Sequence, residues 1–257
     1  MTVALTVDDG VAVLALNRPE VGNAISMQMV EDLRDASATI AADPAVRVVL
    51  FRGNGANFCV GGDLKEFSTL GDRITPTLRV MADVLHEGVA TLVGLEVPVI
   101  VAVQGAAAGA GLSMACIGDI GICAASAKFR VAYTAAGLSP DGGGSWLLPR
   151  LVGPRVAADL ALTNRAFGAE EAQRIGLVSR VVDDDQLQAE AEVLAANLAD
   201  GATGAFRATK RLLATSATSS LPDQLGHEAI SISELAGGVE GQEGIGAFVA
   251  KRTPKYR

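Results

Sequence analysis

The sequence has few aromatic residues, few histidines and few cysteines. Aromatic residues make up 4% of the 257 residues, and the two histidines are His86 and His227. The cysteines, Cys59, Cys116 and Cys123, are odd in number and form no Cys-x-x-Cys pair. This pattern excludes a disulfide framework and a cysteine-based zinc site, so we expect no metal and reduced thiols in a cytoplasmic protein.

Positive charge is also scarce. The formal net charge is −8, which argues against a basic surface for nucleic acid, although a local basic patch could still bind an anionic small molecule. The N-terminus meets Asp8 and Asp9 early and has no basic region, so no signal peptide is expected. The uncharged run from Val97 to Gly118 is interrupted by Pro98 and by several glycines, which favours a buried strand, a turn and a buried helix over a membrane span.

Apolar residues make up 49% of the chain, enough for a sizeable core. Short β-branched runs alternate with helical spacing, which predicts an α/β core. We expect helices over Ser26–Asp43 and Thr75–Leu95, and an all-helical region from about Thr203. The expected strands are Val3–Val7, Val11–Leu16, Val46–Arg52, Val97–Val103, Ile120–Ala125 and Lys128–Val131.

Two glycine-rich turns follow the strands that end near Arg52 and Val103. Their sequences are FCVGGDLK, residues 58–65, and QGAAAGAG, residues 104–111. Small residues allow close approach to the backbone, and two such turns could direct two N–H groups at one carbonyl oxygen as an oxyanion hole. The alternative is that both turns serve only tight helix–sheet packing.

Other glycine and serine motifs do not fit. The second turn lacks the G-x-G-x-x-G spacing, and no Gly-Lys-Ser/Thr follows it, which excludes the usual nucleotide motifs. Ser113 lies too far beyond its strand for a serine-hydrolase elbow. Both histidines fall within helical patterns and are expected to be surface or packing residues, which also disfavours a Ser-His-Asp triad.

Asp141 is the single acid in the stretch SPDGGGSW, residues 139–146. In a Pro-Asp-Gly sequence, an aspartate is often a turn residue or a helix N-cap. A lone carboxylate among small and apolar residues also suits proton transfer. Local sequence leaves both interpretations open.

Five segments carry a resemblance to a known family. They are NFCVGGDLKEF, PVIVAVQGAAAGAGLSMACIGDIGICAASAKF, GLSPDGGGSWLLPRLVG, ALTNRAFGAEEAQRIGLVSRVV and EGIGAFVAKRTPKY. In this order they resemble the enoyl-CoA hydratase/isomerase (crotonase) superfamily. The resemblance implies a spiral of ββα units over residues 1–200 and a helical region over 201–257 that packs between subunits of a homotrimer or dimer of trimers. It also implies an acyl-CoA substrate and no separate cofactor, because coenzyme A is part of the substrate.

The resemblance assigns roles to the two turns. The thioester oxygen would lie between the N–H groups of Gly62 and Ala110, which would stabilise an enolate. The substrate-binding residues that it implies are Cys59, Gly61, Asp63, Leu64, Lys65, Gly109, Ser113, Tyr133 and Lys251.

The resemblance also exposes a departure. Family hydratases have two water-activating glutamates at the positions of Ser113 and Tyr133, and neither is an acid here. Asp141 falls where the single-acid isomerase branches keep their acid, as in 3-enoyl-CoA isomerases and the ring-epoxide isomerase of phenylacetyl-CoA breakdown. This favours an isomerase. A hydratase, a covalent aspartyl mechanism as in the family's aromatic dehalogenases, and a non-catalytic acyl-CoA binder remain as alternatives.

Basic residues near the C-terminus are candidates for binding the CoA phosphates. The stretch KRTPKYR includes Lys251 and Lys255, which could reach a neighbouring subunit's substrate. Lys65 and Arg18 are further candidates. We expect residues Glu66–Thr77 to shape the acyl pocket, whose size the sequence does not specify.

Overall fold

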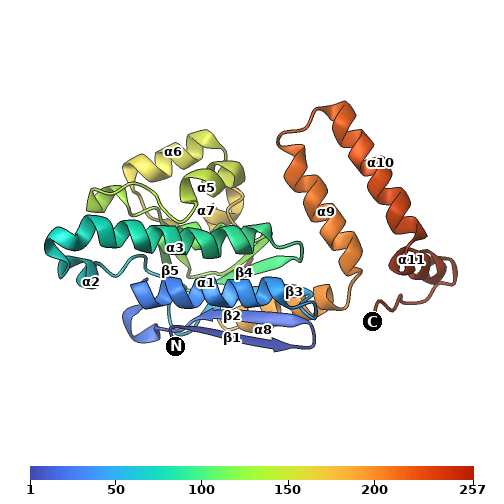
Figure 1. Ribbon diagram of the computed structural model, residues 1–257, viewed down its shortest axis with the longest axis horizontal. Coiled ribbons are helices and arrows are strands. Elements are labelled where there is room, and N and C mark those ends of the chain that lie inside the picture. The colour runs from blue at the N-terminus through green and yellow to red at the C-terminus, as the bar shows by residue number, and fades with distance from the viewer.

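A six-stranded sheet forms the centre of the computed structural model, which describes residues 1–257 (Figure 1). The sheet has the order β1-β2-β3-β4-β6-β9. β1 and β2 are antiparallel and turn at Asp9-Gly10, whereas the other neighbours pair in parallel. The strands are β1 (Val3–Asp8), β2 (Val11–Leu16), β3 (Val48–Gly53), β4 (Val99–Val103), β6 (Ile120–Ala124) and β9 (Arg180–Val182).

Alternate residues of each central strand enter different cores. In β3, Val48 and Leu50 pack beneath α8 (Leu187–Ala199), whereas Val49 and Phe51 belong to the main core. On that side, α1 (Met27–Ala42) and α3 (Ile74–Gly94) run side by side over the sheet (Figure 1). The helices therefore cover both faces of a largely parallel sheet, as expected for an α/β core.

A smaller sheet and four short helices complete the core. β5 (Ala106–Ala108) pairs in parallel with β7 (Lys128–Arg130), and β7 pairs antiparallel with β8 (Phe167–Gly168). None of the helices combines the length and hydropathy of a membrane span, and the uncharged run 97–118 forms β4, β5 and α4. The four helices are α4 (Ala110–Ala115), α5 (Gly144–Val152), α6 (Pro154–Thr163) and α7 (Ala169–Arg174).

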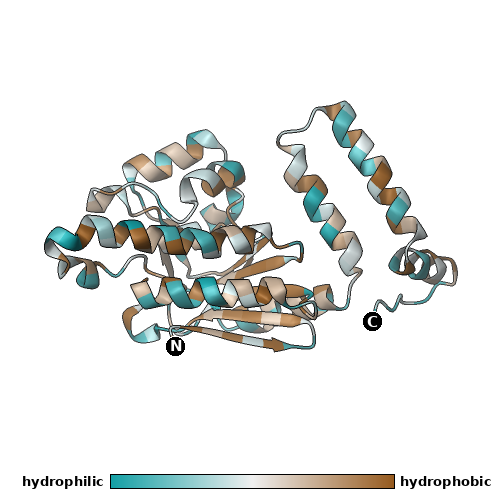
Figure 2. Cartoon of the chain, viewed as in Figure 1, coloured by the Kyte–Doolittle hydropathy of each residue, from teal (hydrophilic) through white to brown (hydrophobic).

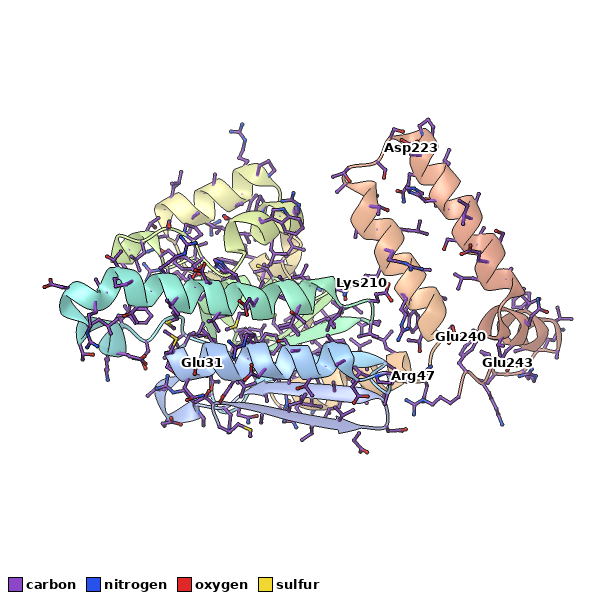
Figure 3. All side chains as sticks on the ribbon, viewed as in Figure 1. Glu31, Arg47, Lys210, Asp223, Glu240 and Glu243 are labelled. Atoms are coloured by element: carbon purple, nitrogen blue, oxygen red, sulfur yellow. The ribbon has the colours of Figure 1, made fainter.

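Three helices after residue 201 stand apart from the core at the right of Figure 1. They are α9 (Thr203–Ser216), α10 (Leu221–Gly237) and α11 (Val239–Val249). Figure 3 shows two of the residues that tie this region to the core: Arg47 donates to the carbonyl of Gly201 at 2.8 Å, and Lys210 lies 2.7 Å from Asp119.

Apolar side chains remain exposed on these helices, where brown and teal residues alternate in Figure 2. Leu213, Ile232 and Phe248 are 70%, 71% and 86% exposed. A subunit interface of the predicted kind would cover such side chains. The expected division at residue 200 and the expected trimer stay predictions.

Local elements differ from the sequence prediction around the glycine turns. Leu64–Ser68 forms a short helix, α2, capped by the Asp63 side chain, which accepts from the Glu66 N–H. The helix after the second turn is short, beginning at Ala110 and ending at Ala115. β5, β8 and β9 were not predicted, because two or three residues carry too little periodicity to indicate a strand.

Candidate active site

The two glycine-rich turns meet at one edge of the large sheet. β3 and β4 are parallel neighbours, so their carboxyl ends, and the turns that follow, lie together. Backbone hydrogen bonds join the turns: the Cys59 N–H donates to the carbonyl of Ala106, and the Ala108 N–H donates to the carbonyl of Cys59, each at 3.0 Å. The turns thus form one backbone unit.

Glycine is required where the turns approach most closely. Gly61 has a φ of +102°, and a Cβ there would lie 2.9 Å from the carbonyl oxygen of Ala108. Gly109 has a φ of +55°, and its Cβ would lie 3.6 Å from the Gly61 Cα. A side chain at Gly61 would therefore be strained and would push the turns apart.

The N–H groups of Gly62 and Ala110 have no acceptor within the chain. Gly62 lies in the loop before α2, and Ala110 is the first residue of α4, where a helix leaves its N–H groups unbonded. Both residues line one cavity of about 410 Å³. Its other walls are largely apolar and include Ile25, Phe67, Leu78, Met81, Leu85 and Tyr133.

Asp141 lines the same cavity and is the one carboxylate among its lining residues. It lies in the loop between a 3₁₀ turn, Thr134–Ala136, and α5. The N-cap of α5 is Gly143, and no side chain caps that helix. The Asp141 side chain is therefore not an N-cap, but its backbone carbonyl accepts from the Gly144 N–H at 3.1 Å, so Asp141 is a turn residue and its part in proton transfer stays a prediction.

His86 on α3 makes the hydrogen bond of the Asp141 carboxylate, with His86 Nε2 2.5 Å from Asp141 Oδ1. The side chains are 50% and 35% exposed, so the acid is less enclosed than its small, apolar neighbours in the sequence suggested. His86 was expected to be a surface or packing residue; it is half exposed, but its contact with Asp141 was not predicted. Helical spacing places His86 on α3. It does not indicate that His86 will contact Asp141, which lies 55 positions further along the chain.

Ser113 and Tyr133 lie together beside Asp141. Their hydroxyl oxygens are 3.1 Å apart, and the Tyr133 hydroxyl donates to the backbone carbonyl of Asp141 at 3.0 Å. Ser113 is 2% exposed. Burial raises the pKa of Tyr133 far above its ordinary value, so the phenol stays neutral and serves as a hydrogen-bonding group.

Several predicted substrate-binding residues have structural roles. Cys59 is fully buried outside the cavity lining, donates from its thiol to the Asn23 carbonyl at 3.1 Å, and has a pKa that burial raises to about 12. Asp63 caps α2 and pairs with Arg18 at 3.1 Å. Gly61, Gly109 and Leu64 do line the cavity, whereas Ser113 lines an adjoining hollow.

Within one chain, Lys251 lies far from Lys65, another predicted phosphate-binding residue. Lys65 is exposed on α2, at the opposite end of the molecule from α11, which Lys251 follows (Figure 1). Arg18 is committed to Asp63 and to the Ala24 carbonyl. A contact from Lys251 to a neighbouring subunit's substrate stays a prediction. Phe67 lines the cavity as expected for the segment 66–77, and Leu78 and Met81 extend that wall along α3.

Comparison with known proteins identifies the family of this chain. Residues 6–257 match the enoyl-CoA hydratase/isomerase family model, and the chain belongs to that family. A solved structure from Mycobacterium abscessus, described as an enoyl-CoA hydratase/isomerase, superposes with a TM-score of 0.96 at 37% identity and 99% coverage of both chains. The chain therefore has the crotonase fold and belongs to a family of enzymes.

Relatives with different named reactions are equally similar. The chain is 38% identical to a Rhodobacter capsulatus protein named "Probable enoyl-CoA hydratase", over 99% of this chain and 97% of the relative. It is also 38% identical to the 1,2-epoxyphenylacetyl-CoA isomerase of Escherichia coli, over 97% of this chain and 96% of the relative. Similarity alone does not choose between hydration and isomerisation.

Proposed function

We propose that this protein is an enoyl-CoA isomerase that moves a double bond of an acyl-CoA through an enolate. The observation that carries the proposal is the single carboxylate, Asp141, in a cavity that also presents the unbonded N–H groups of Gly62 and Ala110. Such a site can stabilise negative charge on a thioester oxygen and can transfer one proton at a time.

The proposed reaction uses one acid twice. In a 3-enoyl thioester, the Asp141 carboxylate takes a proton from the α carbon, and the electrons of that C–H bond form a dienolate whose oxygen accepts from Gly62 and Ala110. The protonated Asp141 then returns its proton to the γ carbon. The electron pair shifts, the product is a 2-enoyl thioester, and the carboxylate is regenerated with no net oxidation or reduction.

Hydration fits the same cavity less well. Syn addition of water needs a base for the water and an acid for the α carbon. The two positions where family hydratases have glutamates hold Ser113 and Tyr133, which bond to each other, and the pKa of Tyr133 is raised by burial. Neither group can serve as a carboxylate base, which supports isomerisation over hydration.

A small substrate panel tests the proposal. The purified protein is incubated separately with 3-enoyl-CoA and 2-enoyl-CoA thioesters of matched chain length, and the products are separated and identified by mass spectrometry. The proposal predicts conversion of the 3-enoyl to the 2-enoyl thioester. Rapid formation of 3-hydroxyacyl-CoA from the 2-enoyl thioester, with no double-bond migration, would instead establish a hydratase.

A further inference from the structure

We propose that His86 is a positioning residue that holds the Asp141 carboxylate in the orientation needed for proton transfer. The inference rests on the proposed isomerase function and adds a residue to it. Its basis is the 2.5 Å contact between His86 Nε2 and Asp141 Oδ1, which joins α3 to the loop before α5.

Asp141 lies between two hollows, and His86 belongs to one of them. The cavity with the free N–H groups is lined by Asp141 but not by His86. A second hollow, of about 380 Å³, is lined by both residues together with Trp146 and Leu147 of α5. His86 therefore contacts the carboxylate without itself lining the cavity that contains Gly62 and Ala110.

The contact leaves one carboxylate oxygen available for chemistry. Oδ1 is bonded to His86, whereas Oδ2 accepts no hydrogen bond from the protein. In this arrangement the transferred proton resides on Oδ2 while Oδ1 stays fixed. One oxygen must reach both the α and γ carbons, so the orientation of the carboxyl plane decides whether both transfers are possible.

Hydrogen bonds from the Tyr133 hydroxyl and the Gly144 N–H hold the backbone carbonyl of Asp141, but neither bond reaches the carboxylate. Gly142 and Gly143, at φ of +59° and +78°, follow Asp141, and its side chain is 35% exposed. Without a partner the carboxylate could rotate toward solvent. The other charged residue lining the cavity, Arg79, is bonded to Asp83 on its own helix and does not contact Asp141. His86 is thus the one side chain that holds this acid.

Kinetics of His86→Ala and His86→Gln test the inference. We expect His86→Ala to lower kcat for 3-enoyl-CoA isomerisation by about 10- to 100-fold, the scale that a small misplacement of a reacting group produces, with KM little changed. Gln places an amide N–H near the position of Nε2, so His86→Gln should recover most of the lost rate. His227→Ala, on α10, is the matched control and should retain the wild-type rate.

Three results would overturn the inference: equal kcat in wild type and His86→Ala, a rate loss expressed only in KM, or a His86→Gln variant as slow as His86→Ala. An active wild type with unaffected His86 variants would leave the isomerase proposal standing. If the wild-type protein had no isomerase activity, the isomerase proposal would be rejected. The proposed effect of His86 on the rate would be rejected with it.

A spectroscopic measurement tests the contact itself, independently of turnover and of the stability of His86→Ala. The chain has two histidines, so His227→Ala assigns both imidazole signals in a proton–nitrogen NMR spectrum. Asp141→Asn should shift the ring signals of His86 and leave those of His227 in place. Unchanged His86 signals would show that the two side chains are not bonded in solution.

Discussion

The Tyr133 hydroxyl donates to the backbone carbonyl of Asp141 at 3.0 Å and so anchors the loop that carries the candidate catalytic acid. The same hydroxyl is 3.1 Å from the hydroxyl of Ser113. The Ser113 and Tyr133 hydroxyls thus form a neutral support for the loop that carries Asp141.

Tyr133→Phe should therefore affect stability more than chemistry. The variant leaves the buried Ser113 hydroxyl without its partner, and we expect the free energy of unfolding to fall by about 1–3 kcal/mol. Isomerase kcat should fall by less than about 100-fold, since a larger loss would be typical of removing an acid or base. Chemical denaturation and steady-state kinetics on the same preparation measure both effects. A greater rate loss without loss of stability would make Tyr133 a proton-transfer residue.

Gly61→Ala tests the backbone unit that positions the free N–H groups. The new Cβ would lie 2.9 Å from the Ala108 carbonyl, at a φ that alanine rarely adopts. We expect a stability loss of about 1–3 kcal/mol from backbone strain, and a fall in kcat of about 100-fold or more if the displaced turn removes one N–H donor from the enolate.

Gly94→Ala is the control for this substitution. Gly94 ends α3, and a Cβ there meets nothing within 4 Å. Its stability should be unchanged or slightly higher, with the wild-type kcat. If Gly61→Ala were as active as Gly94→Ala, the close approach of the two turns would have no part in catalysis.

The C-terminal segment should loosen at acidic pH. Hydrogen bonds from Arg252 and from the Lys255 backbone lower the pKa of Glu243 from 4.5 to about 2. Because the folded-state pKa is depressed, the stabilisation is fully present above pH 4.5 and is lost as the pH falls toward about 2. The difference in Tm between wild type and Glu243→Gln should therefore narrow as the pH drops below 4.5. A difference that stayed constant on acidification would contradict this role for Glu243.

Sequence reasoning located the parts of the site that local chemistry encodes. The glycines at 61 and 109 indicate close backbone approach, and Asp141 stands out as a lone acid among turn residues. The order of β3 and β4 then brings the two turns together. The reaction is harder to predict from the sequence, because relatives of equal similarity are named as a hydratase and as an isomerase.

The sequence could not predict the contact of His86 with Asp141. That contact depends on how α3 packs on the sheet and on where the loop before α5 passes α3. Neither follows from helical spacing. The roles of Cys59 and Asp63 were obscured for a similar reason. Both lie within the first glycine-rich turn, yet the Cys59 side chain is buried and the Asp63 side chain caps α2.

Exchange of the substrate's α proton with heavy water tests the central claim most directly. Asp141→Asn, compared with wild type and with the exposed-loop control Asp185→Asn, is incubated with a saturated acyl-CoA in D₂O, and deuterium at the α carbon is followed by mass spectrometry. A parallel measurement of acyl-CoA binding shows that the cavity is intact. We expect exchange by wild type and by Asp185→Asn, and no exchange by an Asp141→Asn protein that still binds the thioester. Exchange by Asp141→Asn at the wild-type rate would contradict it.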